Sequence, residues 1–321
     1  MSITIERPAR PDRAFRPAST RRARMRARWE GTSPYVYIAP FFVIFAIFGL
    51  LPLLYNFVIS LFDWNPIGEQ TFIGFDNFTR LFADPRFWNA TVNTLGIFVL
   101  STVPQLLLAL GLAHLLNHAR LKAANFFRMS MLVPYITSVA ATTIVFAQLF
   151  DRDYGMLNWL LSFIGIDPIA WVDDRFGSWV VVSTMVAWRW FGYNTLLYLA
   201  ALQAIPRDMY EAAEVDGAGA WHQFRFLTIP SLRPVIIFTV ITSTIGGLQI
   251  FTEPLLLNPA APLTCGSSRQ CQTLVLFLYE QGFGQYAFGY GAAIGVVLFL
   301  IIVVIAGFNF LISTRVRGGR S

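Results

Sequence analysis

The sequence predicts an all-α integral membrane protein with six transmembrane helices and both termini in the cytoplasm. Of the 321 residues, 55% are hydrophobic and 13% are charged, and this charged share is about half that of soluble domains. The apolar residues fall into six long blocks, and the basic residues lie mainly on one side of these blocks. The alternative, buried core helices of a large soluble protein, would require a polar outer layer that this composition does not supply.

Each apolar block is long enough to cross a bilayer, whose hydrocarbon core requires roughly 20 mainly apolar residues per helix. The blocks are Tyr35–Ser60, Val92–Leu116, Phe126–Phe150, Trp179–Ala204, Val235–Leu257 and Ala287–Ile312. They are too long for strands and too continuously apolar for surface helices. We therefore expect one transmembrane domain at 35–312, between a leader at 1–34 and a cytoplasmic tail at 313–321.

The basic residues predict the orientation of these spans. The leader carries nine arginines, and Arg189 lies inside the fourth span. Five basic residues lie in loops on the side opposite the leader: Arg80, Arg86, Arg152, Arg175 and Arg269. All others lie on the leader's side. Because cytoplasmic loops are enriched in Lys and Arg, both termini are predicted to be cytoplasmic.

The leader, 1–34, is interpreted as a disordered basic segment retained ahead of the first span. A targeting sequence is the alternative, but the apolar stretch after Pro34 is about twice as long as a signal-peptide core and lacks a clear small-x-small cleavage site. The net charge is +6. Since the basic excess lies where anionic lipid head groups meet it, we expect membrane lipid as a partner and no nucleic acid.

Two cysteines lie close together in the outer loop between the fifth and sixth spans. Cys265 and Cys271 are separated by Gly-Ser-Ser-Arg-Gln, which is flexible enough to close a ring, and disulfides persist outside the cytoplasm. Two free thiols are the alternative, and a metal site lacks further ligands. We favour a disulfide that staples the loop locally.

The chain lacks the motifs of several enzyme classes. Lys122 is the only lysine and Ala123 follows it, so a phosphate-binding loop ending in Gly-Lys-Ser/Thr cannot form. His114 and His118 are separated by Leu-Leu-Asn, without the Glu base of a zinc protease. We therefore expect no catalytic residue, no metal and no cofactor in this chain.

The cytoplasmic loop at 205–230 has the pattern of two helices joined by a turn. Pro206 suits the first turn of a helix. Three acidic residues favour the positive end of that helix: Asp208, Glu211 and Glu214. Gly217 and Gly219 are predicted to end it.

The second predicted helix of this loop carries Trp221, Phe224 and Leu227 at spacing three, a partly apolar face, and ends at Pro230. Two interpretations are open on these grounds alone. The pair of helices is a docking element for a soluble partner, or it is an amphipathic segment resting on lipid.

The same loop resembles the "EAA" loop of binding-protein-dependent ABC importer permeases, including its spacing. The matching residues are Glu211, Ala212, Ala213, Asp216, Gly217, Ala218, Trp221, Phe224, Ile229 and Pro230. Elsewhere the chain is similar to the sugar branch of that family, the group of the maltose transporter membrane subunits. The stretch from Phe72 to Trp88, followed by Asn93 and Thr94, resembles its first outer loop.

The resemblance implies the partners and the mechanism. Two permease subunits enclose a pathway, two ABC ATPase subunits bind ATP and Mg beneath them, and an extracytoplasmic sugar-binding protein delivers the solute. Glu211 would pair with a basic ATPase residue, while Ala212, Ala213 and Gly217 allow close approach. The chain has one such loop, so it would form half of the pathway in a bacterial inner membrane, without an ATPase site of its own.

The run from Gly246 to Pro254 most resembles permeases for disaccharides of the cellobiose or lactose type, and an oligosaccharide or another small polar solute stays open. A secondary transporter driven by an ion gradient is the alternative function. It would show inverted repeats and intramembrane carboxylates, whereas Glu253 is the one acidic residue within a span.

Four polar residues of the fourth and fifth spans are candidates for the pathway: Arg189, Asn194, Gln249 and Glu253. Counted along straight helices, Arg189 lies about 15 Å deep and Glu253 about 6 Å deep. This difference argues against a direct ion pair unless Arg189 stretches outward or the helices are offset. A central charge facing lipid costs about 2.5–3.5 kcal/mol. The alternative role for any single one is to hold helices together, and we expect at least two of the four to line the pathway.

Overall fold

The computed structural model describes residues 35–66, 68–118 and 124–315, so the predicted leader and the end of the predicted tail lie outside the described residues. The described residues divide into two units, with the boundary between Tyr55 and Asn56. In the first unit, the described residues belong to the apolar helix Tyr35–Ile59, which has a mean hydropathy of 2.4. This helix includes a π-helical turn, η1 (Ala46–Leu50), and continues as α2 (Leu51–Ile59) into the second unit.

A small hairpin that the sequence did not predict follows α2 in the second unit. Strands β1 (Phe62–Asp63) and β2 (Thr71–Phe72) pair antiparallel, with Phe62 opposite Phe72. The short helix α3 (Asp76–Ala83) follows. The buried Asn77 side chain donates hydrogen bonds to the carbonyls of Ser60 and Phe62, both at 2.9 Å. The amide therefore fixes α3 against the hairpin.

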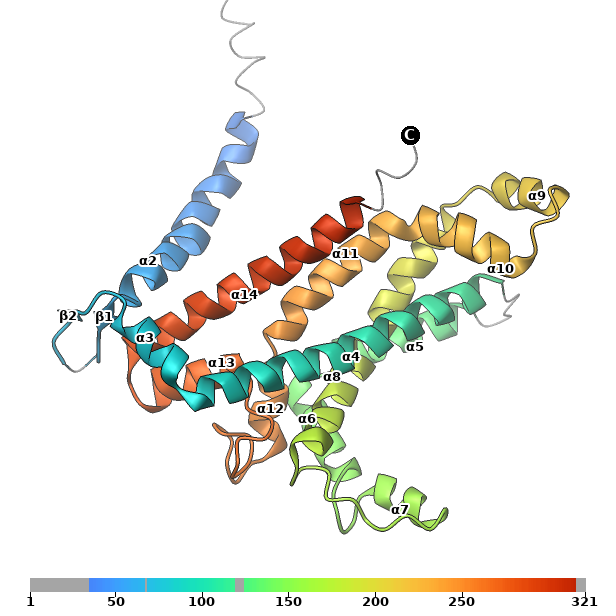
Figure 1. Cartoon of the computed structure of the whole chain (residues 1–321). Coiled ribbons are helices and arrows are strands. Elements are labelled where there is room, and N and C mark those ends of the chain that lie inside the picture. Colours follow the sequence, from blue (N-terminus) through green and yellow to red (C-terminus); the bar gives the residue numbers. More distant parts are fainter. Residues whose placement is uncertain (1–34, 67, 119–123, 316–321) are drawn as a thin grey trace, which may run out of the picture. The chain divides into compact units, whose positions relative to one another are not determined.

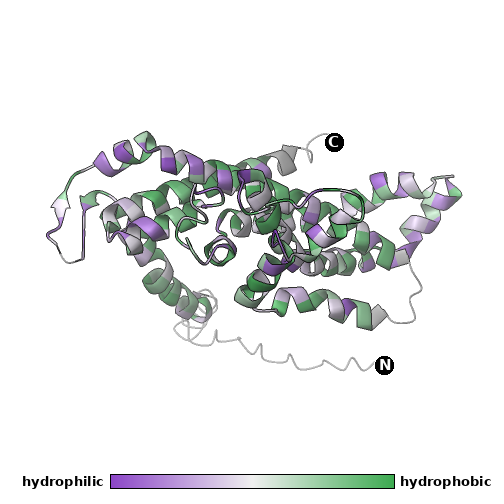
Figure 2. Ribbon diagram, turned by 90° about the horizontal axis from the view of Figure 1, so that it is seen from below, coloured by the Kyte–Doolittle hydropathy of each residue, from purple (hydrophilic) through white to green (hydrophobic). Residues whose placement is uncertain are grey.

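Long helices make up most of the second unit (Figure 1). They are α4 (Pro85–His118), α8 (Arg175–Gln203), α11 (Ile229–Leu248) and α14 (Phe288–Arg315). The contact between α4 and α8 is the most extensive in the unit, and α11 contacts both α4 and α14. Figure 2 shows hydrophobic residues along much of the helical ribbon, with hydrophilic residues between them.

Four described helices are long and apolar enough to cross a membrane: Tyr35–Ile59, Pro85–Asn117, Ala220–Leu248 and Phe288–Leu311. A fifth candidate is a bent pair at Phe126–Leu149. Helix α8 has 29 residues but is not among them, because residues such as Arg189 and Asn194 lower its mean hydropathy. The chain is therefore a multi-pass membrane protein.

The third predicted span is not one straight helix. Helices α5 (Ala124–Ile136) and α6 (Val139–Leu149) meet at an angle of 93°. Pro134 lies in the last turn of α5 and has no N–H to donate to the preceding turn, which weakens the helix there. Ser138 then adopts an extended ψ of 129°, and the chain turns.

The fifth predicted span, Val235–Leu257, is also broken. Helix α11 ends at Leu248, and a short helix, α12 (Thr252–Leu257), begins four residues later. A helix through this point would place the ring of Pro254 against the carbonyl of Ile250, four residues earlier. Instead, that carbonyl accepts a hydrogen bond from Thr273 Oγ1 at 2.9 Å. The proline therefore accounts for the break.

The apolar core of the second unit consists of three clusters, each of which includes residues of α4. One joins α4 to α14 and to α13 (Leu274–Tyr279), which leads into the π-turn η3 (Glu280–Gly284). A second joins α4 to α6, α8 and α12. The third joins α4 to the C-terminal half of α8 and to α11. Packing therefore ties the two broken spans to one common helix pair, α4 and α8.

The segment between α6 and α8 contains the short helix α7 (Met156–Ser162). The side chain of the buried Asn158 holds this segment together. Its Nδ2 donates to the carbonyls of Asp151, Arg152 and Ile169, and its Oδ1 accepts from Trp171 Nε1 at 3.0 Å. One amide therefore satisfies several backbone groups that no helix or sheet would satisfy.

Candidate functional site: a polar cavity and a projecting helix pair

The segment that follows α8 folds as the sequence predicts at its start. Helix α9 (Arg207–Val215) begins directly after Pro206. It ends at Val215, and two residues later Gly217 has a φ of +80°, a conformation that only glycine adopts without strain. The Ala218 N–H bonds to the Ala213 carbonyl at 2.9 Å and the Gly217 N–H to the Glu214 carbonyl at 3.0 Å. These bonds close the helix and turn the chain back.

The second helix of this segment does not end at Pro230 as predicted. Helix α10 (Ala220–Gln223) passes through a π-turn, η2 (Phe224–Thr228), directly into α11. The Ile229 N–H bonds to the Phe224 carbonyl across this π-turn, so Pro230 stands in the first turn of α11. At that position a missing N–H costs little. The α10 segment is therefore an extension of the fifth span.

Two contacts hold α9 and α10 in place. The hydroxyls of Tyr210 and Thr228 lie 3.0 Å apart and join α9 to η2. The ring of Phe224 packs at 4.6 Å from the ring of His114 on α4. Phe224 also contacts the ring of Trp221 at 5.7 Å, so the partly apolar face predicted here connects the exposed Trp221 to the helix bundle.

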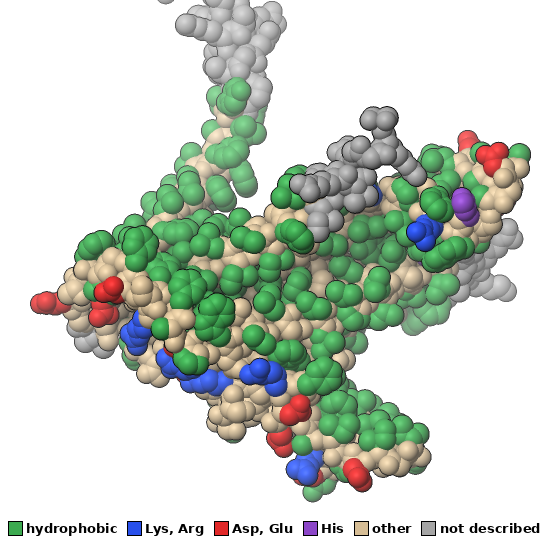
Figure 3. Space-filling model, in the orientation of Figure 1, with side chains coloured by type: hydrophobic (Ala, Val, Ile, Leu, Met, Phe, Trp, Pro, Cys, Tyr) green, Lys and Arg blue, Asp and Glu red, His purple; other side chains and the backbone are tan. Residues whose placement is uncertain are grey.

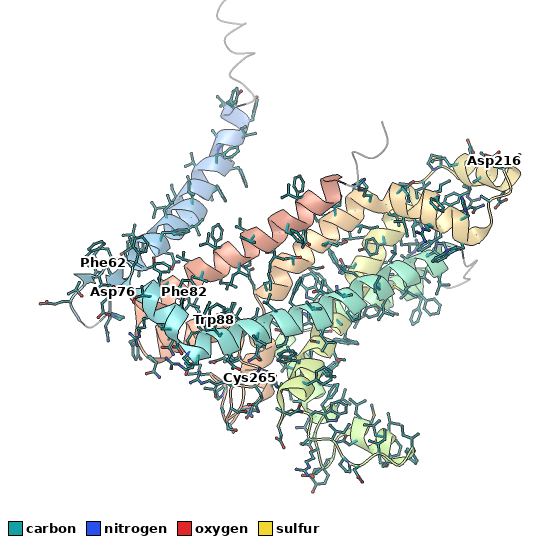
Figure 4. All side chains as sticks on the ribbon, in the orientation of Figure 1. Phe62, Asp76, Phe82, Trp88, Asp216 and Cys265 are labelled. Carbon is teal, nitrogen blue, oxygen red and sulfur yellow. A yellow bond between two sulfur atoms is a disulfide. The ribbon has the colours of Figure 1, made fainter. Side chains whose placement is uncertain are left out.

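The α9–α10 tip presents both apolar and acidic side chains. Val215 is 89% exposed and Trp221 is 71% exposed, and Glu211, Ala212 and Asp216 are also exposed. Figure 3 shows acidic side chains gathered at this end, and Figure 4 places Asp216 at its tip. A projecting surface with exposed apolar side chains and carboxylates is suited to docking a protein that carries basic residues.

A cavity of about 240 Å³ lies between α4, α5, α8 and α11. Aromatic side chains form one wall. The rings of Tyr135 and Tyr193 are stacked at 4.9 Å, and Trp190 meets Tyr135 at 5.2 Å. Tyr135 comes from the last turn of α5 before its bend, so the break in the third span presents this ring to the cavity.

Amide and hydroxyl groups form the rest of the polar lining. Gln105 and Asn194 are each 2% exposed, and both line the cavity together with Thr102, Thr242 and Ser243. Among the described residues, Gln105 Nε2 and Asn194 Nδ2 have no hydrogen-bond partner. A buried donor without a partner costs about 1–3 kcal/mol. Two such donors at one cavity indicate a site for a ligand with hydroxyl acceptors.

The four predicted pathway residues have different positions. Asn194 lines the cavity. Gln249 is exposed, lies in the break after α11 and is not among the lining residues. Arg189 and Glu253 form an ion pair, with 3.7 Å between Nη1 and Oε1. The expectation that depth would keep these two charges apart was wrong, because it assumed that the fifth span is straight.

Sequence reasoning missed three lining residues on the second and third spans: Thr102, Gln105 and Tyr135. Gln105 gave a signal, since an amide within an otherwise apolar span is costly and marks a functional position. Tyr135 gave none, because its role depends on the bend of α5 against α6.

A second polar network lies around the loop between α12 and α13. Cys265 and Cys271 are joined by a disulfide in this loop, and Figure 4 labels Cys265 there. The Arg269 carbonyl accepts hydrogen bonds from Asn89 and Asn93 of α4, both at 2.9 Å. The Arg269 guanidinium donates to Glu280 Oε1 at 2.7 Å. The stapled loop is therefore anchored to α4 and to η3.

Removing the disulfide should have a small effect. In a Cys265→Ser, Cys271→Ser variant we expect a loss of stability below the roughly 3 kcal/mol of a 15-residue ring, since this ring is shorter. The Arg269 contacts also remain. Thermal unfolding of the purified protein measures the loss, and unfolding at ambient temperature would contradict the expectation.

Two carboxyls of this region have lowered pKa values. Burial alone would raise the pKa of Glu280, but hydrogen bonds from Arg269 and Gln272 outweigh burial and lower it below its ordinary 4.5. Burial would also raise the pKa of Asp84, but hydrogen bonds from Arg86 and Tyr290 outweigh burial and lower this pKa below its ordinary 3.8. Both groups are therefore held in the charged form.

These lowered pKa values predict an acid-sensitive contribution to stability. A carboxyl with a depressed folded-state pKa stabilises fully above its unfolded-state pKa and loses that effect as the pH falls through the folded value. We expect the midpoint of thermal unfolding to fall as the pH drops below the unfolded-state values of 4.5 and 3.8 towards the lower folded-state values. The drop should be smaller in Glu280→Gln, and an equal drop in both proteins would contradict the assignment.

Comparisons with known proteins give a consistent result. Residues 82–318 match the family described as "Binding-protein-dependent transport system inner membrane component". The chain is 38% identical to the lactose transport system permease protein LacF of Rhizobium radiobacter, over 91% of this chain and 97% of that protein. It is 34% identical to the arabinooligosaccharides transport system permease protein AraP of Bacillus subtilis, over 89% and 90% of the two chains.

The fold also matches a solved structure, a bacterial alginate ABC transporter in complex with an alginate pentasaccharide-bound periplasmic protein. The TM-score is 0.76 at 22% sequence identity, with 90% of this chain and 98% of the other covered. At this identity the match supports the fold alone.

Proposed function

The chain belongs to the family of binding-protein-dependent transport system inner membrane components, and from this we propose that it is the permease subunit that forms half of the pathway of an ABC importer for a disaccharide or oligosaccharide. The observation that carries the choice of solute is the cavity between α4, α5, α8 and α11. Its aromatic wall suits the apolar faces of a pyranose ring, and its unpartnered amide donors suit the hydroxyls.

The proposed topology has six spans, with the α9–α10 tip and both termini in the cytoplasm. Helix α8 is then the fourth span. The broken pairs α5–α6 and α11–α12 are the third and fifth spans. The asymmetry of basic residues supports this orientation, which places the disulfide loop in the oxidising compartment outside. Broken spans that meet at a cavity are tolerated because the irregular backbone lines protein or water and not lipid. The membrane is the bacterial inner membrane.

The proposed partners are a second permease subunit, two ABC ATPase subunits that bind ATP and Mg, and an extracytoplasmic sugar-binding protein. The ATPase is proposed to dock on the α9–α10 tip. In this arrangement Glu211 pairs with a basic ATPase residue, and Ala212, Ala213 and Gly217 present little side-chain bulk. Because α10 continues into α11, which lines the cavity, movement of the tip would reach the cavity through one helix.

The function is tested by uptake in a strain that lacks this chain but keeps its partners. Radiolabelled lactose and arabinooligosaccharides are the probes, because two relatives that align with most of this chain are named for transport of these sugars. We expect uptake of one of them to return with the wild-type chain. If neither these probes nor other disaccharides enter, the solute class is wrong. The ion-gradient transporter, the alternative function, would keep its uptake when the ATPase genes are deleted.

A further inference from the structure

The ion pair between Arg189 and Glu253 joins two elements on the flank of the cavity. Arg189 lies on α8 next to Trp190, which lines the cavity, and Glu253 lies on α12, three residues beyond the lining residue Ile250. The side chain of Glu253 is 9% exposed and that of Arg189 is 22% exposed. The pair is therefore largely removed from solvent beside the proposed solute site.

Helix α12 is held to the rest of the molecule mainly by apolar packing. The break after Leu248 separates it from α11, and Gly246 and Gly247 precede that break. It packs on α6 and α8 through apolar residues that include Leu255 and Leu257. Among the described residues, the ion pair with Arg189 is the one polar contact between an α12 side chain and another element.

The segment from Ile250 to Pro259 also contributes residues to two cavities. Ile250 lines the 240 Å³ cavity, and residues 256–259 line a second one of about 320 Å³. The second cavity is bounded by α6 and by the chain before α8, including Trp171 and Asp173. In the proposed topology it faces outward. The two ends of this one segment therefore line different cavities.

The pair itself is incompletely satisfied. The distance of 3.7 Å exceeds that of a hydrogen bond, and Arg189 Nε is buried without a hydrogen-bond partner among the described residues. A permanent structural pair in a membrane protein is stabilising only with good geometry and further hydrogen bonds. A loose pair is suited to a contact that breaks and re-forms.

We propose that Arg189 and Glu253 form a latch that holds α12 against α8 and opens when the cavity is exposed to the outer side. This inference rests on the proposed function and assigns a positioning role to both residues, distinct from contact with the solute. It requires the distance between α8 and α12 to change during each transport cycle, while the contact between α4 and α8 stays fixed.

State-dependent crosslinking tests the latch. Both residues are replaced by cysteine in a Cys265→Ser, Cys271→Ser background, which removes both charges together and leaves no unpaired charge in the membrane. A short, cleavable, bifunctional thiol reagent is applied to the assembled complex without nucleotide, and with ATP but no Mg²⁺. We expect crosslinking at least tenfold slower with ATP bound. We also expect crosslinking to abolish uptake of the solute that the wild-type chain transports, and cleavage of the crosslink to restore it.

The matched control is a cysteine pair at Asn93 and Trp179, which hydrogen-bond across the α4–α8 contact at 3.2 Å. This pair should crosslink at the same rate in both states. Equal rates in both states for the Arg189–Glu253 pair, with uptake retained after crosslinking, would overturn the latch. If the background variant itself shows no ATP-driven uptake of any disaccharide tested, the proposed function fails instead.

A charge exchange provides a second variant. Arg189→Glu and Glu253→Arg each place two like charges together and should reduce uptake strongly. The double exchange restores an opposite pair and should recover at least tenfold more uptake than either single variant at equal abundance in the membrane. No recovery in the double exchange would count against the pair as a latch.

Discussion

Replacing Glu211 with alanine, or Gly217 with leucine, should abolish ATP-driven uptake while the chain inserts at near-normal abundance. Glu211 is exposed on α9, and the loss of a charge-assisted contact at an interface costs about 2–5 kcal/mol, or on the order of 30-fold or more in affinity. Gly217→Leu is expected to act through backbone strain. A side chain at φ +80° is strained, so the turn between α9 and α10 would have to rearrange.

Co-purification of the ATPase with the tagged chain, together with solute uptake, measures both effects. Glu214→Ala is the matched control for Glu211→Ala, since Glu214 is another exposed carboxylate of α9 and lies outside the matched motif. We expect the control to keep most of its uptake and its bound ATPase. Normal uptake and normal co-purification in both Glu211→Ala and Gly217→Leu would show that the tip does not dock the ATPase.

The second large effect is expected at the cavity. Asn194→Leu keeps a side chain of similar size but removes the amide that has no partner among the described residues. A solute hydroxyl left without its hydrogen bond in a buried site costs about 1–3 kcal/mol. We therefore expect a 5- to 150-fold rise in the KM for uptake, with little change in the amount of chain in the membrane.

Thr195→Val is the matched control for this substitution. Thr195 is fully buried in the next position of α8, and its hydroxyl bonds to the Phe191 carbonyl of its own helix at 2.7 Å. Loss of that hydroxyl should leave the KM within about twofold, because the bond is internal to α8 and Thr195 does not line the cavity. Equal effects of Asn194→Leu and Thr195→Val on the KM would show that the solute does not bind in this cavity.

Hydropathy predicted the helices well where a span is unbroken. The first block, Tyr35–Ser60, differs by one residue from the observed helix Tyr35–Ile59. The agreement is close because the bounds of an unbroken span follow from the hydropathy of its side chains. The turn at Gly217 was also predictable, since it depends on one residue and its own backbone.

The breaks were not predicted, because they depend on backbone hydrogen bonds and not on side-chain hydropathy. Pro254 is apolar and continued the fifth block, although its ring displaces the carbonyl of Ile250 from the helix. The same omission led to the wrong expectation for Arg189 and Glu253, whose depths were counted along straight helices. The cavity was predicted only through Asn194, since Gln105 and Tyr135 reach it from helices distant in the sequence.

The most direct test of the account measures solute uptake into proteoliposomes that contain the chain with or without its proposed partners. The complete system contains the second permease, both ATPases and the binding protein. ATP-Mg is supplied on the side of the membrane that the ATPases face, and we expect uptake of the disaccharide against its gradient. We expect none when the ATPases are omitted or when ATP is replaced by ADP. Uptake by this chain alone, driven by an ion gradient, would contradict the proposed function.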